Sequence, residues 1–232
     1  MAIVYGRPDS EIQLLGKYPR AVKTIDDIPK IHHQVKEKIK NNNGGFFGEI
    51  RRWYHQRQAN LFELNKGHLL HAGASGELRA LDRLSRLGDE YHVLCGVNIE
   101  LDRWVTYNGK RNLGSAQMDF VVVSKKGVVV IEVKNWGMQT ISRRKGISPH
   151  EQVDRAGRVL WIALQAWWRP KKPGVSRVIL SIQGNIAYDP RHKYVRVSDL
   201  NTILHFLENR KTEFSEKEAR RIVGRLKRHV TR

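Results

Sequence analysis

Three charged side chains stand where two apolar segments of the sequence are expected to meet. Glu132 and Lys134 follow the apolar run 128–131, and Asp119 lies in the segment before that run. Residues i and i+2 of a strand point to the same face, so Glu132 and Lys134 should project together. If residues 125–127 close an antiparallel hairpin, Asp119 comes opposite the neighbourhood of Glu132 and Val133. Two carboxylates and one ammonium group would then converge at one edge of a sheet.

These groups suit the hydrolysis of a phosphodiester bond. Mg²⁺ is usually held by one or two carboxylates, while waters and substrate phosphate complete its coordination shell. The ion polarises the phosphoryl oxygen and lowers the pKa of the attacking water, and a lysine beside it can neutralise the developing charge. The alternative is a cross-strand ion pair without any chemistry. Burying three charges among β-branched residues costs desolvation free energy, which favours the functional interpretation.

Glu77 is a further acidic candidate. It shares a helical face with Leu81 and Leu84, at the i+4 and i+7 positions, so it should face the core. The alternative is that Glu77 simply lies in the first turn of a helix, where the macrodipole favours acidic side chains. The spacing by itself leaves these two explanations open.

The elements that would position these groups follow from hydrophobic periodicity. Helices are predicted over residues 24–40, 47–65, 76–87, 150–168 and 200–209, and a last helix opens at a capping box, Ser215 to Glu218. Strands are predicted over residues 91–99, 116–123, 127–134, 177–183 and 194–197. The uninterrupted run 128–131 should be buried on both faces. This order of elements predicts an α/β fold in which helices flank a mixed central sheet.

Composition and charge restrict the class of protein. The 232 residues are 40% hydrophobic, which suffices for a folded core and excludes a disordered chain. The single cysteine, Cys95, excludes an internal disulfide. No apolar run is long enough to cross a bilayer and no secretory leader is evident, so we expect a cytoplasmic protein without a membrane contact.

The net charge of +19 is the strongest global signal. It exceeds the magnitude of about 2–8 that solubility alone requires of a small domain. Residues 143–232 carry 21 Lys and Arg against 8 Asp and Glu, a net +13, whereas residues 73–142 carry 9 against 8. Lys and Arg that neutralise phosphates release condensed counterions, so a nucleic acid is the expected partner.

Three blocks of the sequence together resemble the nuclease-related domain, NERD, a branch of the PD-(D/E)xK nuclease superfamily. They are Gly73 to Glu77, Gln117-Met118-Asp119, and Gly127 to Asn135, and the resemblance extends over about residues 70–210. Met118 departs from the proline of the wider superfamily, although the Q-x-D form of the motif accepts this. The first 70 residues have no counterpart in the resemblance.

The resemblance implies a restriction-endonuclease-like core over residues 71–210, with an N-terminal helical extension, 1–70, and a basic C-terminal helix, 211–232. It implies that Asp119, Glu132 and Glu77 hold Mg²⁺ or Mn²⁺ and that Lys134 is the catalytic lysine. Gln152 resembles a downstream glutamine that orients substrate or water, and Gln117 has a supporting place. The expected activity is a metal-dependent endonuclease.

The substrate is less sharply defined by the sequence. DNA is favoured, an RNA-directed nuclease and a non-catalytic nucleic-acid-binding or assembly module remain alternatives, and a homodimer is left open. Basic residues that follow the catalytic segment are the preferred phosphate contacts. They are Arg143, Arg144, Lys145, Arg169, Lys171 and Lys172. Sequence-specific DNA-binding motifs are not evident, so selectivity should depend on nucleic-acid structure.

Overall fold

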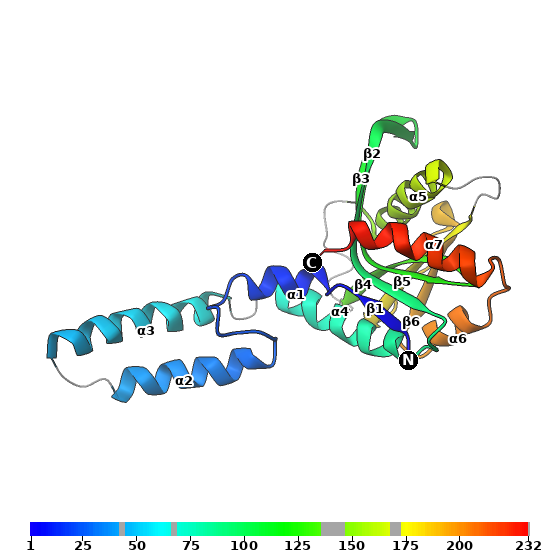
Figure 1. Cartoon of the computed structure of the whole chain (residues 1–232). Coiled ribbons are helices and arrows are strands. Elements are labelled where there is room, and N and C mark those ends of the chain that lie inside the picture. Colours follow the sequence, from blue (N-terminus) through cyan, green and yellow to red (C-terminus); the bar gives the residue numbers. More distant parts are fainter. Residues whose placement is uncertain (42–44, 66–68, 136–146, 168–172, 232) are drawn as a thin grey trace. The chain divides into compact units, whose positions relative to one another are not determined.

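The computed structural model describes residues 1–41, 45–65, 69–135, 147–167 and 173–231 (Figure 1). The chain forms two compact units. The sheet unit comprises Met1–Asp9 and Gly76–Arg232, and the helical unit comprises Ser10–Ser75. None of the described helices combines the length and apolar character that a membrane span requires.

A six-stranded mixed sheet forms the centre of the sheet unit, with the strands in the order β1 to β6. The strands are β1 Ile3–Tyr5, β2 His92–Tyr107, β3 Lys110–Ser124, β4 Gly127–Asn135, β5 Val175–Gln183 and β6 Val195–Asp199. The first pair is parallel, β2, β3 and β4 are antiparallel, and β4, β5 and β6 are parallel. The predicted mixed sheet is therefore confirmed, and the arrangement is that of a restriction-endonuclease-like fold.

Helices cover both faces of this sheet (Figure 1). Helices α5 (Pro149–Trp167) and α7 (Glu216–Leu226) bury their apolar side chains against one face. The other face packs against α6 (Ile203–Glu208) and the C-terminal part of α4 (Leu69–Ser85). Residues 128–131 are buried between the two layers, as their β-branched sequence predicts.

The turn between β3 and β4 forms at the predicted place. Gly127 has a φ of +114°, a conformation that side chains of L-residues rarely adopt. The pairing runs from Ser124 with Gly127 to Phe120 with Ile131. Asp119 precedes Phe120 in β3 and therefore lies opposite Glu132, close to the C-terminal end of β4.

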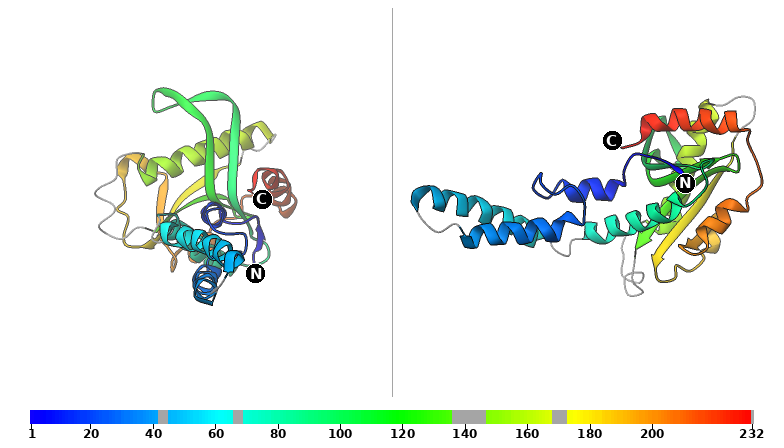
Figure 2. Two further views of the ribbon diagram at one scale, coloured as in Figure 1. Left: turned by 90° about the vertical axis from the view of Figure 1, so that its left-hand side faces the viewer. Right: turned by 60° about the horizontal axis from the view of Figure 1, so that its bottom comes forward.

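Strands β2 and β3 extend well beyond their predicted ends. Residues 100–114, here called the β-arm, leave the sheet as a two-stranded ribbon that bends over α5 (Figure 2, left). Its turn consists of Asn108 and Gly109, with φ values of +48° and +77°. Asn-Gly is the strongest short hairpin signal in a sequence, so this dipeptide predicts the ribbon even though hydrophobic periodicity does not.

The start of α4 corrects a second expectation. The sequence predicts a helix over residues 76–87, whereas α4 begins at Leu69 and runs through Gly73 and Gly76. The physical reason is close packing, because a Cβ built on Gly76 would lie only 2.7 Å from the Cβ of Asn135. A glycine inside this helix lets the helix approach the end of β4. Strand β1 and helix α1 (Asp9–Leu15) were not predicted.

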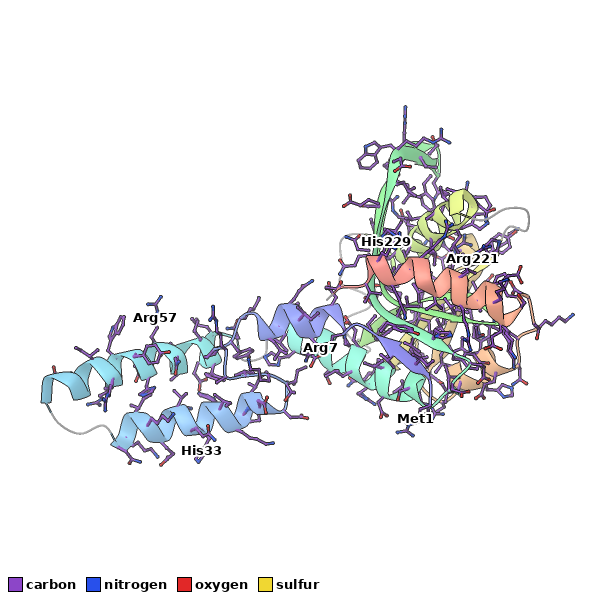
Figure 3. The ribbon with its side chains drawn as sticks, in the orientation of Figure 1. Met1, Arg7, His33, Arg57, Arg221 and His229 are labelled. Atoms are coloured by element: carbon purple, nitrogen blue, oxygen red, sulfur yellow. The ribbon has the colours of Figure 1, made fainter. Side chains whose placement is uncertain are left out.

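The helical unit has its own small core. Helices α2 (Asp27–Asn41) and α3 (Gly45–Asn65) pack together, close to the positions expected from periodicity. Val35, Ala59 and Phe62 belong to the apolar cluster of this unit. His33 and Arg57 point away from the contact between α2 and α3 and are exposed (Figure 3).

Candidate active site

The end of β4 presents Glu132 and Lys134 on the face that α5 covers. The exposed fractions of their side chains are only 3% and 12%. The Lys134 ammonium group donates to Oε1 of Glu132 at 2.6 Å and to Oε1 of Gln152 at 2.9 Å. Gln152 lies in the first turns of α5. Strand alternation and the start of one helix therefore bring a carboxylate, an ammonium group and an amide together.

Asp119 joins this group from β3. Its Oδ2 accepts a hydrogen bond from the backbone N–H of Val133 at 2.7 Å. The hydrogen bond fixes the carboxylate across the hairpin, between the positions of Glu132 and Lys134 on the neighbouring strand. The register predicted from the turn at 125–127 thus brings Asp119 to the expected place.

A kink in β2 and β3 occurs at Asp119. Cys95 and Phe120 pack in the cluster under α4, whereas Val97 and Met118, two residues further along each strand, pack in the cluster under α5. A regular strand would keep residues i and i+2 on one face, so both strands change face at this level. Gly96, with a φ of +58°, supplies the backbone conformation that the change requires.

The chain close to the C-terminus holds this kink in place. The backbone N–H and the hydroxyl of Thr231 both donate to the carbonyl of Gly96, at 3.0 and 2.8 Å. The preceding Val230 forms a β-bridge with Val97. Residues more than 100 positions away in the sequence thereby stabilise the strand bend beside Asp119.

Glu77 reaches the same neighbourhood from α4. Its side chain is buried, and its negative charge contributes to raising the pKa of Glu132. The absence of a side chain at Gly76 allows α4 to lie against Asn135, one residue after Lys134. Helix α4 therefore adds a third carboxylate to the site, as an inward-facing position predicted.

Burial has the largest influence on the ionisation of the carboxyl groups of the site, and repulsion between these groups adds to it. Burial, followed by the charge of Glu132, raises the pKa of Asp119 to about 8, although Lys134 and the N–H of Val133 oppose the shift. Burial also raises the pKa of Glu132, against the stabilising effect of Lys134 and Gln152. Asp119 and Glu132 therefore both resist ionisation in the metal-free site, and a bound cation would lower both of their pKa values.

The donor atoms present fit a hard divalent cation. Oε2 of Glu132 is buried and has no hydrogen-bond partner in the described part of the chain, which would be costly unless another group bound it. Mg²⁺ needs only one or two protein carboxylates, since water and phosphate supply the remaining ligands. The described residues do not form a ready-made cage of three or more His, Cys, Asp or Glu ligands. The arrangement therefore fits an ion with an open coordination shell.

Comparison with known protein families gives a match over residues 72–181, to the model described as the nuclease-related domain, NERD. The chain carries a nuclease-related domain. This family belongs to the PD-(D/E)xK-like nuclease group. Neither the curated proteins nor the solved structures include a match to this chain. Glu77, Asp119, Glu132, Lys134 and Gln152 all lie inside the matched segment.

A residue outside the matched segment also approaches the site of the nuclease-related domain. Gln117, two residues before Asp119, donates from its side-chain amide to Oδ2 of Asp9, and the charge of Asp9 contributes to the raised pKa of Asp119. Asp9 begins α1. The sequence offered no signal for this neighbour, because 110 positions separate it from Asp119.

The basic residues preferred as phosphate contacts all fall outside the described residues. This applies to Arg143, Arg144, Lys145, Arg169, Lys171 and Lys172. Their role stays a prediction.

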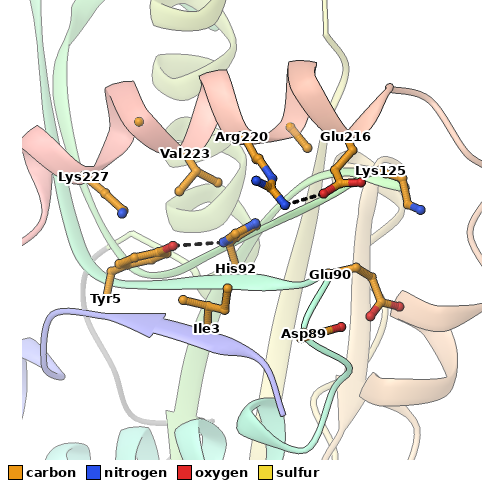
Figure 4. Close-up of a pocket in the computed structure, with 12 residues that line it drawn as sticks. Ile3, Tyr5, Asp89, Glu90, His92, Lys125, Glu216, Arg220, Val223 and Lys227 are labelled. Carbon is orange, nitrogen blue, oxygen red and sulfur yellow. Dashed lines mark hydrogen bonds and ion pairs between the residues drawn. The ribbon is translucent and has the colours of Figure 1, made fainter.

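A separate cavity of about 380 Å³ lies at the opposite end of the sheet, under α7 (Figure 4). His92 and Tyr5 form its floor, joined by a hydrogen bond of 3.1 Å, and Lys227 stands 3.9 Å from the centre of the Tyr5 ring. Arg220 points into the cavity but is paired with Glu216 at 2.5 Å. This cavity shares no lining residue with the carboxylate site, so we assign the two to different parts of the domain.

Proposed function

We propose that the nuclease-related domain is a Mg²⁺- or Mn²⁺-dependent endonuclease that hydrolyses phosphodiester bonds, with DNA as the preferred substrate. The observation that carries this proposal is the buried ion pair of Glu132 and Lys134 beside Asp119, in which Oε2 of Glu132 has no hydrogen-bond partner among the described residues. The family match and the net charge of +19 support a nucleic acid as the substrate.

Asp119 and Glu132 would hold the divalent ion, and Glu77 would complete the acidic surroundings. When bound, the ion would polarise a phosphoryl oxygen and lower the pKa of a water molecule. The protein supplies the orientation of the two ligands. The N–H of Val133 fixes Asp119, and Lys134 fixes Glu132, so neither carboxylate has to reorganise when the ion arrives.

Lys134 is the group that would meet the charge of the reacting phosphate. Its two acceptors, Glu132 and Gln152, come from a strand and a helix, which limits the rotation of a long and flexible side chain. A preorganised ammonium group stabilises negative charge that develops in the transition state without further rearrangement. Gln152 holds Lys134 through its amide oxygen, and a side-chain hydrogen bond from Gln152 also favours the ionised form of Glu132, so this residue would position both groups for substrate or water.

The test is cleavage of plasmid, linear, single-stranded and branched DNA by the purified chain with Mg²⁺ or Mn²⁺. Wild-type protein should cut at least one of these substrates, and EDTA should stop the reaction. Asp119→Asn and Lys134→Gln should each reduce the rate by on the order of a hundredfold or more. Asp89→Asn and Lys217→Gln, two exposed positions away from the site, should leave the rate unchanged.

Absence of cleavage on every substrate, with both metals and at low salt, would contradict the proposal. If the protein then still bound nucleic acid, the binding-module alternative would replace it. Cleavage of RNA alone would retain the chemistry and overturn the preference for DNA.

A further inference from the structure

In the outer part of the β-arm, every charged side chain is positive. Residues 103–112 contain Arg103, Lys110 and Arg111 and no Asp or Glu. All three are exposed. Glu100 and Asp102 lie at the base of the ribbon, so only its outer part offers a narrow, positively charged surface, and the natural complement of that surface is a polyanion.

An exposed tryptophan lies on the same ribbon. The exposed fraction of Trp104 is 60%, which is unusual for so large an apolar side chain. The ring lies beside Gly114 of β3, since a Cβ built on that glycine would lie 3.0 Å from it. The side chain of Arg111 donates to the carbonyl of Trp104 at 3.3 Å and so connects the two strands at this level. The surface thus combines cationic groups with a flat aromatic one.

The β-arm is firmly attached to α5. The hydroxyl of Tyr107 donates to Oδ2 of Asp154 at 2.6 Å, and the guanidinium group of Arg155 donates to the carbonyl of Asn112 at 2.7 Å. The same guanidinium group lies 5.1 Å from the centre of the Tyr107 ring. Tyr107 itself is buried. These contacts near the turn hold the ribbon in one position over the helix, so its orientation is preorganised for a ligand.

The attachment point lies beside the catalytic cluster. Gln152, which contacts Lys134, is two to three residues from Asp154 and Arg155 on α5, less than one turn of about 5.4 Å. The tip of the β-arm and the end of β4 are therefore coupled through the first turns of a single helix. A nucleic acid bound by the arm would pass close to the carboxylates.

We propose that the β-arm enters the major groove of duplex DNA and so makes double-stranded DNA the substrate form of this nuclease. This inference rests on the proposed function. The major groove of B-form DNA, about 12 Å wide, admits a two-stranded β-ribbon. Lys110 and Arg111 would contact phosphates at the groove edge, and Trp104 would contact apolar base edges inside the groove.

Duplex RNA is the decisive comparison. The major groove of A-form RNA is deep and too narrow for side chains to read, so a ribbon of this width is excluded from it. Basic residues elsewhere on the protein would attract both duplexes equally through counterion release. Only a contribution from groove insertion should separate DNA from RNA. If the β-arm instead bound a protein partner, substitutions in the arm would not change the affinity for duplex DNA relative to that for duplex RNA.

The experiment measures the dissociation constants of the full chain for a DNA duplex and an RNA duplex of the same sequence. It is done in EDTA, so no cleavage occurs. The double variant Lys110→Gln/Arg111→Gln is compared with Lys217→Gln/Arg225→Gln, which removes the same charge from exposed positions on α7. Trp104→Ala tests the uncharged contribution. Far-ultraviolet circular dichroism and melting temperature establish that each variant is folded.

We expect the arm double variant to weaken DNA binding by on the order of tenfold or more and to reduce the salt slope by about two. Trp104→Ala should weaken DNA binding severalfold without changing that slope, because it removes no charge. Binding of duplex RNA should change by less than about twofold in both arm variants. The α7 control, whose charges attract both duplexes, should weaken DNA and RNA binding equally, and DNA binding by less than the arm double variant does.

Equal losses for DNA and RNA, or an arm effect no larger than that of the control, would overturn the inference. If the arm variants selectively lose DNA binding but the wild-type chain cuts no substrate with Mg²⁺ or Mn²⁺, the catalytic proposal fails and the DNA-binding role of the β-arm stands. The lysine-only variant Lys110→Gln provides the answer if the double variant unfolds, with about half the change in slope expected.

Discussion

Charge balance at a few side chains decides the character of this site. In the described part of the chain, Lys134 lowers the pKa of both Asp119 and Glu132, whereas the negative charge of Glu77 raises that of Glu132. If these carboxylates served only to stabilise the fold, they would be expected to carry lowered pKa values and complete hydrogen bonding. Two features are instead typical of a functional site that tolerates unfavourable burial: the raised pKa of Asp119, and the lack of a hydrogen-bond partner for Oε2 of Glu132 among the described residues.

Asp119 should make the stability of the metal-free protein depend on pH. Its pKa is about 8 in the folded state against 3.8 for the unperturbed group, so the folded state binds more protons between these values. The free energy of unfolding should therefore fall as pH rises from about 4 to about 8, by up to a few kcal/mol. Asp119→Asn keeps an acceptor for the N–H of Val133 and should flatten this part of the profile.

Urea unfolding in EDTA at pH 5 and pH 8 measures the effect. Asp119→Asn should be more stable than wild type at pH 8, and the two should converge at pH 5. Addition of Mg²⁺ at pH 8 should raise the stability of the wild type and not that of the variant. Parallel pH profiles for the two proteins would contradict the assigned charge state of Asp119.

At the scale of elements, the site depends on how closely α4 approaches β4. Gly76 is inside a helix, where glycine costs up to about 1 kcal/mol relative to alanine. The contact with Asn135 explains why a glycine stands there, because any side chain would separate the helix from the strand. Glu77 is the next residue, so the distance between these two elements sets the position of its carboxylate.

Gly76→Ala should therefore weaken cation binding although it improves helix propensity. Gly224→Ala is the matched control, since Gly224 lies in α7 and a Cβ there would meet no atom within 4 Å. We expect the control to gain up to about 1 kcal/mol of stability and to retain the Mg²⁺-dependent rise in melting temperature. Gly76→Ala should gain less, or lose stability, and its Mg²⁺-dependent rise should shrink. An unaltered rise would show that α4 does not position the site.

Periodicity predicted most of the elements, and local packing explains those it missed. Strand β4 was evident because β-branched residues buried on both faces leave a continuous signal. The capping box at Ser215 and Glu218 is confirmed at the start of α7. The β-arm was missed because its strands are exposed and carry little apolar alternation. Strand β1 has only three residues, too few for a periodic signal.

For the whole molecule, the net charge of +19 predicts how nucleic acid is bound. The catalytic segment 73–142 is nearly neutral, so most of the attraction must come from residues 143–232, with a net +13. The dissociation constant for a DNA duplex should rise a hundredfold or more between 50 and 200 mM salt, because several phosphate contacts release counterions. Fluorescence anisotropy titrations across this range measure the slope. A change in the dissociation constant of less than about threefold would contradict a mainly electrostatic mode of binding.

The sequence by itself determined which reactive side chains the site contains and how the strands place three of them: Asp119, Glu132 and Lys134. Alternation along a strand places Glu132 beside Lys134, and the short turn between β3 and β4 fixes Asp119 across from them, so local rules suffice for this part. Composition and charge likewise predicted a nucleic-acid partner without any knowledge of the fold. The roles of the individual side chains stay predictions that the variants above would test.

Tertiary structure decided everything that depends on segments meeting from far apart in the chain. The approach of Asp9 to Asp119, the hold of Thr231 on Gly96, and the attachment of the β-arm to α5 are set by packing between elements. These contacts leave no periodic pattern in the sequence, because the two partners of each contact lie between 47 and 135 positions apart. Short-range propensity carries no information on such pairs, which only the folded sheet brings together.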